Sequence, residues 1–111
     1  MDAAVGEPTP DVSVLIPTYR EALTIGPVVR ELRAALESAG ISHEVLVLDD
    51  ASDDGTAAEA DRAIGGAGRV VHRSGPRSLA AAVRDGFAAA RARCAVVMDA
   101  DGSHPPTEVP S

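Results

Sequence analysis

The chain has 111 residues, of which 45% are apolar and only 2% aromatic, so it fits one small domain, or part of a larger one, with an aliphatic core. Its formal net charge is −7, which argues against a nucleic-acid backbone as partner. Every basic residue is an arginine, and this absence of lysine excludes P-loop NTPases and Schiff-base enzymes.

The N-terminal residues 1–11 are acidic, contain proline and lack the apolar run of a signal peptide. We expect this segment to be disordered. No later stretch approaches the roughly 20 apolar residues of a membrane span. These features predict a soluble, cytoplasmic protein.

Four short apolar runs predict β-strands, at residues 12–16, 44–48, 69–72 and 95–98. The first, second and fourth are nearly continuous in β-branched residues or leucine, as in strands buried on both faces. Cys94, the only cysteine, precedes the last run, and we expect it in the core without a disulfide or a metal.

Three segments with helical spacing separate these strands, at residues 25–36, 56–64 and 79–93. Gly40 is expected to close the first helix at its C′ position. The hydroxyls of Ser52 and Thr56 are expected to serve as turn and N-cap groups before the second. Four apolar residues share one face of the third: Leu79, Val83, Phe87 and Ala90.

The alternation of strands and helices predicts an α/β fold, a doubly wound and mostly parallel sheet with helices on both faces. In an open sheet of this kind, ligands bind beyond the carboxyl ends of the strands. The sequence stops soon after the fourth predicted strand, where such a sheet normally continues. We therefore interpret it as a truncated domain with an open apolar edge.

Acidic or hydrogen-bonding residues follow three of the four strands, at residues 17–21, 49–56 and 99–101. Asp99 and Asp101 suit a hard cation such as Mg²⁺ or Mn²⁺, which keeps open positions for diphosphate oxygens. The alternative for this pair is a solvated turn. Asp50 is placed to accept a base N–H, and the competing interpretation groups it with Asp53 and Asp54 as acids at a helix N-terminus.

The loop after the first strand offers groups for a nucleotide. Pro17 rigidifies it, Tyr19 has a flat face on which a base can stack, and Glu21 can accept from a base or a ribose hydroxyl. A core role is the alternative for Tyr19. We interpret His104 as stabilising a turn rather than binding metal, and the glycine run at 65–68 as a loop rather than a dinucleotide fingerprint.

Three stretches, in this order, resemble motifs of glycosyltransferase family 2, whose members have the GT-A fold. The likeness covers about residues 12–110. Residues 12–21, VSVLIPTYRE, look like the family's opening strand and PTYNE turn, with Arg20 where Asn is usual. Residues 47–56, VLDDASDDGT, look like its VDDxSxDGT stretch. Residues 97–106, VMDADGSHPP, resemble the MDADxxHPPE form of the dolichol- or polyprenol-phosphate mannosyltransferases.

The resemblance implies that residues 12–111 form a partial GT-A nucleotide-sugar-binding domain of an inverting, metal-assisted transferase. The implied donor is GDP-mannose and the implied acceptor a polyprenyl or dolichyl phosphate, with peripheral contact to the cytoplasmic membrane face through that acceptor. The implied nucleotide-sugar-binding residues are Pro17, Tyr19, Glu21, Leu48, Asp50, Asp99, Ala100 and Asp101. Asp99 and Asp101 are the implied catalytic residues, and with Ser103 they would hold Mg²⁺ or Mn²⁺.

The sequence also departs from the family pattern. Arg73 and the start of the third helix match the RxGxxGLGxA region near the diphosphate, but Ser78 and Ala80 replace two of its glycines. Ser103 stands where Gln can act as a third metal ligand, and Thr107 replaces a Glu after the proline pair. The resemblance implies that the acceptor-binding half of the family domain lies outside these residues.

Two alternatives stay open. One is a truncated, non-catalytic fragment that only binds nucleotide, and the other is a family 2 transferase that uses a UDP-sugar donor. A signalling receiver domain is a further class with clustered aspartates. We disfavour it because no acidic pair follows the first strand and no lysine occurs late in the chain.

Overall fold

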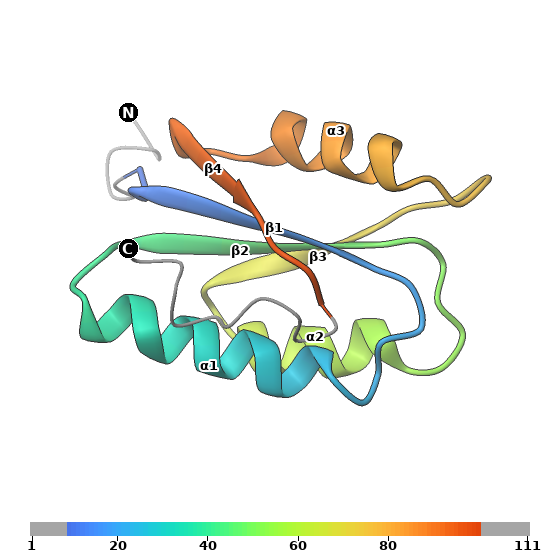
Figure 1. Cartoon of the computed structure of the whole chain (residues 1–111), viewed down its shortest axis with the longest axis horizontal. Helices are drawn as coiled ribbons and strands as arrows, with labels where there is room; N and C mark the ends of the chain where they lie inside the picture. The colour runs from blue at the N-terminus through green and yellow to red at the C-terminus, as the bar shows by residue number, and fades with distance from the viewer. Residues whose placement is uncertain (1–8, 101–111) are drawn as a thin grey trace.

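The structure is a computed structural model that describes residues 9–100. Its elements are β1 (Val12–Thr18), α1 (Ile25–Ser38), β2 (His43–Asp49), α2 (Thr56–Ile64), β3 (Gly68–His72), α3 (Leu79–Ala89) and β4 (Cys94–Val97). All neighbouring strands are parallel, in the order β3-β2-β1-β4. The helices α1 and α2 lie together on one face and α3 lies on the other (Figure 1). The predicted α/β class is confirmed.

The two central strands, β1 and β2, carry the core on both faces. Successive strand residues point to opposite sides of a sheet. Val14 and Ile16 of β1 therefore pack in a cluster with the inner residues of α1 and α2, whereas Leu15 packs with Leu46, Leu48 and Ala82 beneath α3. This confirms that the first two predicted strands are buried on both faces.

Helix α3 contacts the sheet through its small residues, not through the predicted apolar stripe. Ala82 and Gly86 are its buried residues, while the side chains of Leu79 and Phe87 are 69% and 55% exposed. The spacing identified residues that share a face of the helix. The face that packs against the sheet is a different one, because its small side chains allow the helix to approach the strands closely. The helix also ends at Ala89 rather than at residue 93, because the next residue is extended.

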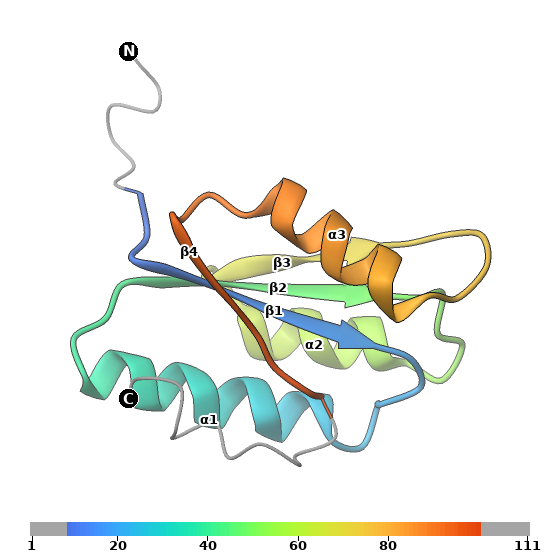
Figure 2. The ribbon, with the colours of Figure 1, turned by 45° about the horizontal axis from the view of Figure 1, so that its top comes forward.

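Gly86 sets how closely α3 approaches the sheet. A Cβ atom at this position would lie 3.1 Å from Leu15 Cδ1 and 3.2 Å from Leu48 Cδ2. Contacts this short require the leucine side chains to move. The glycine therefore holds α3 directly over β1 and β2, as the turned view in Figure 2 also shows.

Strand β4 is an edge strand, as the predicted open edge requires, but its residues are only partly buried, so the prediction that it is buried on both faces is wrong. It pairs with β1 alone among the described strands. Cys94 is exposed and Val97 is 41% exposed, so the expected core position of the cysteine is wrong. The reason is that α3 covers β1 and β2 and leaves the outer part of β4 open.

The ends of the helices agree with the predictions only in part. Gly40, with φ of +71°, follows the C-cap Ala39 of α1, as predicted. The N-cap of α2 is Gly55 and not Thr56, whose hydroxyl instead donates to Asp54. Within residues 9–100, no helix has both the length and the apolar character required to cross a bilayer.

Ordered contacts begin before β1. The backbone N–H of Asp11 donates to the carbonyl oxygen of Ser42 at 2.9 Å, and its carboxylate accepts from the Ser42 N–H at 3.1 Å. The last residue of the segment expected to be disordered is therefore tied to the chain that enters β2.

Candidate active site

A cavity of about 210 Å³ lies at the carboxyl ends of β1 and β2, next to the start of α3. Its wall is formed by Pro17, Thr18, Tyr19, Glu21, Asp50, Arg77, Leu79 and Ala82. Four of these residues were predicted to bind a nucleotide sugar, namely Pro17, Tyr19, Glu21 and Asp50. The fold therefore brings groups from two strand ends, 29 or more residues apart in the sequence, into one cavity.

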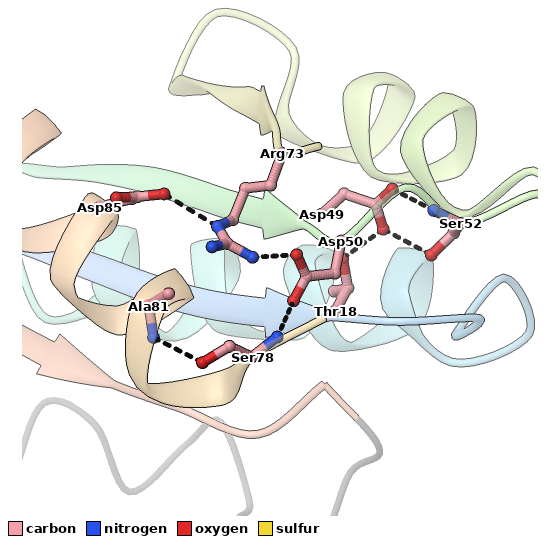
Figure 3. Close-up of polar contacts among 8 residues, drawn as sticks. All are labelled: Thr18, Asp49, Asp50, Ser52, Arg73, Ser78, Ala81 and Asp85. Carbon is pink, nitrogen blue, oxygen red and sulfur yellow. Dashed lines mark hydrogen bonds and ion pairs between the residues drawn. The ribbon is translucent and has the colours of Figure 1, made fainter. Parts of the chain in front are cut away.

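Asp50 is held by the loop that leads into α3. Its side chain is nearly buried; one carboxylate oxygen pairs with the guanidinium of Arg73, and the other accepts from the backbone N–H of Ser78 at 3.1 Å (Figure 3). Arg73 Nε also donates to Asp85 at 2.8 Å, and the hydrogen bond with Asp85, followed by the charge of Asp50, raises the pKa of this arginine. Asp50 thus faces α3, which rules out its grouping with the acids that enter α2.

The neighbouring Asp49 faces the other way, and its carboxylate is occupied by hydrogen bonds within the protein. Its carboxylate accepts from the hydroxyl of Thr18 at 2.7 Å, the hydroxyl of Ser52 at 2.7 Å and the backbone N–H of Ser52 at 2.9 Å (Figure 3). It is 2% exposed. Asp49 therefore ties the end of β1 to the turn after β2, and Ser52 serves as the predicted turn hydroxyl.

The loop after β1 is braced by the turn that enters α2. The backbone N–H of Arg20 donates to the Ser52 hydroxyl at 2.8 Å, and that of Glu21 donates to the Thr56 hydroxyl at 2.8 Å. The Thr56 hydroxyl in turn donates to Asp54, and this bond is the main cause that lowers the pKa of Asp54. The hydroxyls of the second motif, with Asp54 as partner of Thr56, therefore position the loop of the first motif.

Tyr19 and Arg20 occupy unusual environments in that loop. Tyr19 is 37% exposed at the cavity, so the alternative of a core role is wrong. Arg20 has φ of +57°, in the left-handed region that Asn tolerates better than most side chains. The backbone thus explains why Asn is the usual residue at this position of the motif.

Two predicted contact residues lie in the core. Leu48 is fully buried in the cluster beneath α3 and does not line the cavity, so the expected side-chain contact with base or ribose is not supported. The Leu48 side chain points from β2 toward Gly86 of α3. Ala100 is 3% exposed and packs in the cluster on the α1 side.

The predicted metal ligands are described only in part. Asp99 is exposed and follows Met98, whose N–H donates to the Leu15 carbonyl oxygen at 2.9 Å, so Asp99 lies at the carboxyl edge of the sheet. Its carboxylate oxygens are donors of the kind that Mg²⁺ and Mn²⁺ prefer. Asp101, Ser103 and His104 lie outside the described residues. Within the described part, no three His, Cys, Asp or Glu residues form a metal-binding group.

Sequence reasoning missed the capping role of Ser78 and the position of Arg77 at the cavity, both in the loop before α3. Ser78 is the N-cap of α3, and its hydroxyl accepts from the Ala81 N–H at 3.1 Å, so the serine that replaces a motif glycine stabilises the helix start (Figure 3). Arg77 lines the cavity, with its guanidinium carbon 4.1 Å from the centroid of the Tyr19 ring. No spacing pattern in the sequence pairs residues 19 and 77.

Comparison with known proteins places this arrangement in a family. Residues 13–111 match the model of the family described as glycosyl transferase family 2. The chain is 39% identical over 110 residues to the dolichol-phosphate mannosyltransferase of Mycosarcoma maydis, covering 93% of this chain and 37% of that protein.

Solved structures show the same fold. A mannosyltransferase from Pyrobaculum calidifontis in complex with GDP-Man and Mn²⁺ has a TM-score of 0.68 and 28% identity, over 92% of this chain and 30% of that one. Glucosyl-3-phosphoglycerate synthase from Mycobacterium tuberculosis, in complex with Mn²⁺, UDP and phosphoglyceric acid, has a TM-score of 0.68 and 25% identity, over 88% and 34% of the two chains.

The chain spans less than two fifths of the length of the first two relatives, at 37% and 39%. The family match nevertheless covers nearly the whole of it, and the sheet order and the three strand-end motifs agree with that match. The chain therefore belongs to glycosyl transferase family 2, with the GT-A-like fold that the resemblance implied.

Proposed function

We propose that this chain forms the nucleotide-sugar-binding part of a metal-assisted glycosyltransferase that transfers mannose from GDP-mannose to a polyprenyl or dolichyl phosphate. The observation that carries the proposal is the cavity in which Tyr19 and Glu21, from the loop after β1, meet Asp50 from the end of β2. The names of the Mycosarcoma maydis relative and of the Pyrobaculum calidifontis structure support mannose as the sugar.

Each side chain of the cavity has a role suited to its chemistry. Tyr19 provides an exposed ring on which a base stacks. Glu21 and Asp50 accept hydrogen bonds from base N–H or ribose O–H groups, and Asp50 is held in place for this by Arg73 and Ser78. Pre-positioned acceptors of this kind select one base over another.

Asp99, together with Asp101 and Ser103, would hold Mg²⁺ or Mn²⁺. A divalent ion there neutralises charge on the departing nucleoside diphosphate. In the transfer, a phosphate oxygen of the acceptor attacks C1 of the mannose, and the bond from C1 to the diphosphate oxygen breaks. The bonding electrons leave with the diphosphate. The ionised acceptor needs no strong general base, and its lipid tail implies peripheral contact with the cytoplasmic membrane face.

Two other functions have support of their own. A UDP-sugar donor is supported by the Mycobacterium tuberculosis neighbour, whose complex contains UDP. The second is nucleotide binding in this cavity without transfer of the sugar. The net charge of −7 disfavours a nucleic-acid partner in either case.

Isothermal titration of the folded chain with GDP-mannose and UDP-glucose, in Mn²⁺ and in EDTA, tests these functions. We expect tighter binding of GDP-mannose, dependent on Mn²⁺, and at least about a tenfold loss in Asp101→Ala and in Asp50→Asn. Asp61→Asn, at an exposed position of α2, is the matched control.

Each other outcome selects a different conclusion. Tighter binding of UDP-glucose supports the UDP-sugar alternative. Binding of GDP-mannose without transfer to a polyprenyl phosphate supports the nucleotide-binding fragment. Absence of binding by a chain that is folded by circular dichroism overturns the proposal.

A further inference from the structure

Arg77 and Tyr19 form a contact at the cavity that the proposed function does not use. The guanidinium carbon of Arg77 lies 4.1 Å from the centroid of the tyrosine ring, and both side chains line the cavity. Arg77 is exposed, and a cation–π contact at an exposed site is weak. The contact can therefore be exchanged for a stronger one without a large cost.

The loop that carries Arg77 is anchored at both ends. Asp50 binds both ends of the loop before α3, through the guanidinium of Arg73 and the backbone N–H of Ser78. The Ser78 hydroxyl also caps the helix by accepting from the Ala81 N–H. Arg77 is the residue directly before this anchored cap, so its side chain starts from a defined position at the cavity wall.

Arg77 differs from the nearby arginines in its charge partners. Arg73 is paired with Asp50 and Asp85, and Arg20 is paired with Asp53 at 2.9 Å. Within residues 9–100, no carboxylate forms an ion pair with Arg77. Its positive charge is therefore available to an anion.

The rest of the cavity wall makes a cation favourable for an anionic ligand. Of the two carboxylates of the wall, Asp50 has its charge balanced by Arg73, whereas Glu21 repels a diphosphate. A guanidinium offers two parallel N–H donors to phosphate oxygens, in the geometry that makes arginine the preferred ligand for such groups.

From this arrangement we infer that Arg77 is a nucleotide-positioning residue that covers the Tyr19 ring when no base is stacked there and moves to the diphosphate when a base takes its place on the ring. The inference rests on the proposed function. A base that enters the cavity and stacks on Tyr19 needs the space that the guanidinium occupies, so the two compete for the ring. Displacement by the base frees the guanidinium for the phosphates of the same nucleotide.

This exchange predicts that Arg77→Ala affects the binding of two ligands differently. A nucleoside must displace Arg77 and offers it no phosphate in return, so Arg77→Ala binds guanosine as well as, or better than, the parent chain. A nucleoside diphosphate loses its guanidinium contact, so Arg77→Ala binds GDP roughly tenfold more weakly. Titration in EDTA, with no divalent ion to neutralise the diphosphate, isolates this contribution.

The composition of the chain supplies a direct probe. Tyr19 is the only tyrosine and there is no tryptophan, so ring-labelled tyrosine gives one set of aromatic NMR signals that report on this site alone. Without ligand, Arg77→Ala shifts the Tyr19 ring signals. Arg84→Ala, which removes the same charge from an exposed position of α3 outside the cavity wall, leaves them in place.

The outcomes separate this inference from the proposed function. If neither ligand moves the Tyr19 signals of the folded parent chain, the proposed nucleotide site itself fails, and the inference fails with it. If both ligands bind the parent, but Arg77→Ala weakens guanosine and GDP equally or weakens neither, the exchange is refuted while the nucleotide site stands. Weaker binding of GDP with unchanged or tighter binding of guanosine, a pattern absent in Arg84→Ala, establishes the exchange.

Discussion

Buried carboxylates occur at both ends of the sheet, but the two groups do different things. At the amino end, Glu44 of β2 is 2% exposed and accepts from the Ser13 hydroxyl and the Arg91 backbone N–H, both at 2.6 Å, and from Arg91 Nε at 3.2 Å. The Ser13 hydroxyl accepts in turn from the Ala92 N–H at 3.1 Å. This network ties β1 and β2 to the chain between α3 and β4.

At the carboxyl end, Asp50 is equally anchored, by Arg73 and Ser78, but it also lines the cavity. Its anchors come from the loop that carries Arg77, so the same bonds that hold the acid also shape the ligand site. The difference teaches that burial and saturation alone do not identify a functional acid. What distinguishes Asp50 is that its surroundings leave room for a ligand.

The largest effect is expected from a substitution that breaks the network at the amino end. Glu44→Ala leaves the Ser13 hydroxyl and the donors of Arg91 without their acceptor, and we expect it to lower the free energy of unfolding by about 3 kcal/mol. Urea denaturation measures this. Glu37→Ala removes an exposed partner of Arg33 and is the control, with an expected loss below about 0.5 kcal/mol. Equal losses in both variants would show that the network adds no stability.

The second prediction separates the adjacent acids at the carboxyl end. Asp49→Asn replaces an acceptor of three hydrogen bonds, and we expect a loss of stability of about 1–3 kcal/mol with GDP-mannose affinity changed less than about threefold. Asp50→Asn is expected to weaken binding at least about tenfold. Denaturation and titration of both variants measure the two effects. A reversed pattern would assign the ligand to Asp49 and contradict the cavity assignment.

The third prediction concerns pH. Burial raises the pKa of Glu44, but hydrogen bonds from Ser13 and the Arg91 N–H, with the charge of Arg91, outweigh it and lower the pKa below 4.5. The unfolded state therefore takes up the proton first, so the stability from Glu44 is present above pH 4.5 and is lost as the pH falls below it.

Unfolding of the parent and of Glu44→Gln, measured from pH 7 to pH 3, checks this sign. The parent is expected to be more stable at pH 7. The difference between the two free energies of unfolding is expected to become smaller below pH 4.5. The lowered pKa of Asp54 acts in the same direction but is common to both chains, so it cancels in the difference. A gap that is constant or widens with acid contradicts the prediction.

The smallest effect concerns backbone strain at the ligand end. Arg20→Asn places a residue that tolerates the left-handed region at φ of +57°, and we expect a gain of about 0.5 kcal/mol. The lost pair with Asp53 is exposed and contributes little. Arg62→Asn, within α2 and paired with Glu59, is the control and is expected to lose a few tenths of a kcal/mol. A loss of stability in Arg20→Asn would show that the arginine side chain outweighs the strain.

The sequence by itself determined the order of the elements, the fold class and half of the cavity residues. Periodicity is local information, and the carboxyl ends of parallel strands must share one edge, so Pro17, Tyr19, Glu21 and Asp50 could be grouped before any coordinates were known. The resemblance of the three motifs identified the family. These are properties that neighbouring residues impose on one another.

Only the tertiary structure decided which face of α3 packs, that Cys94 of β4 is exposed, and that Leu48 is covered by α3. It also decided that Asp49 is structural while Asp50 lines the cavity, and that Arg77 covers Tyr19. Each of these depends on contacts between segments far apart in the sequence. Such contacts are selected by close packing and by hydrogen-bond geometry, which spacing along one segment does not encode.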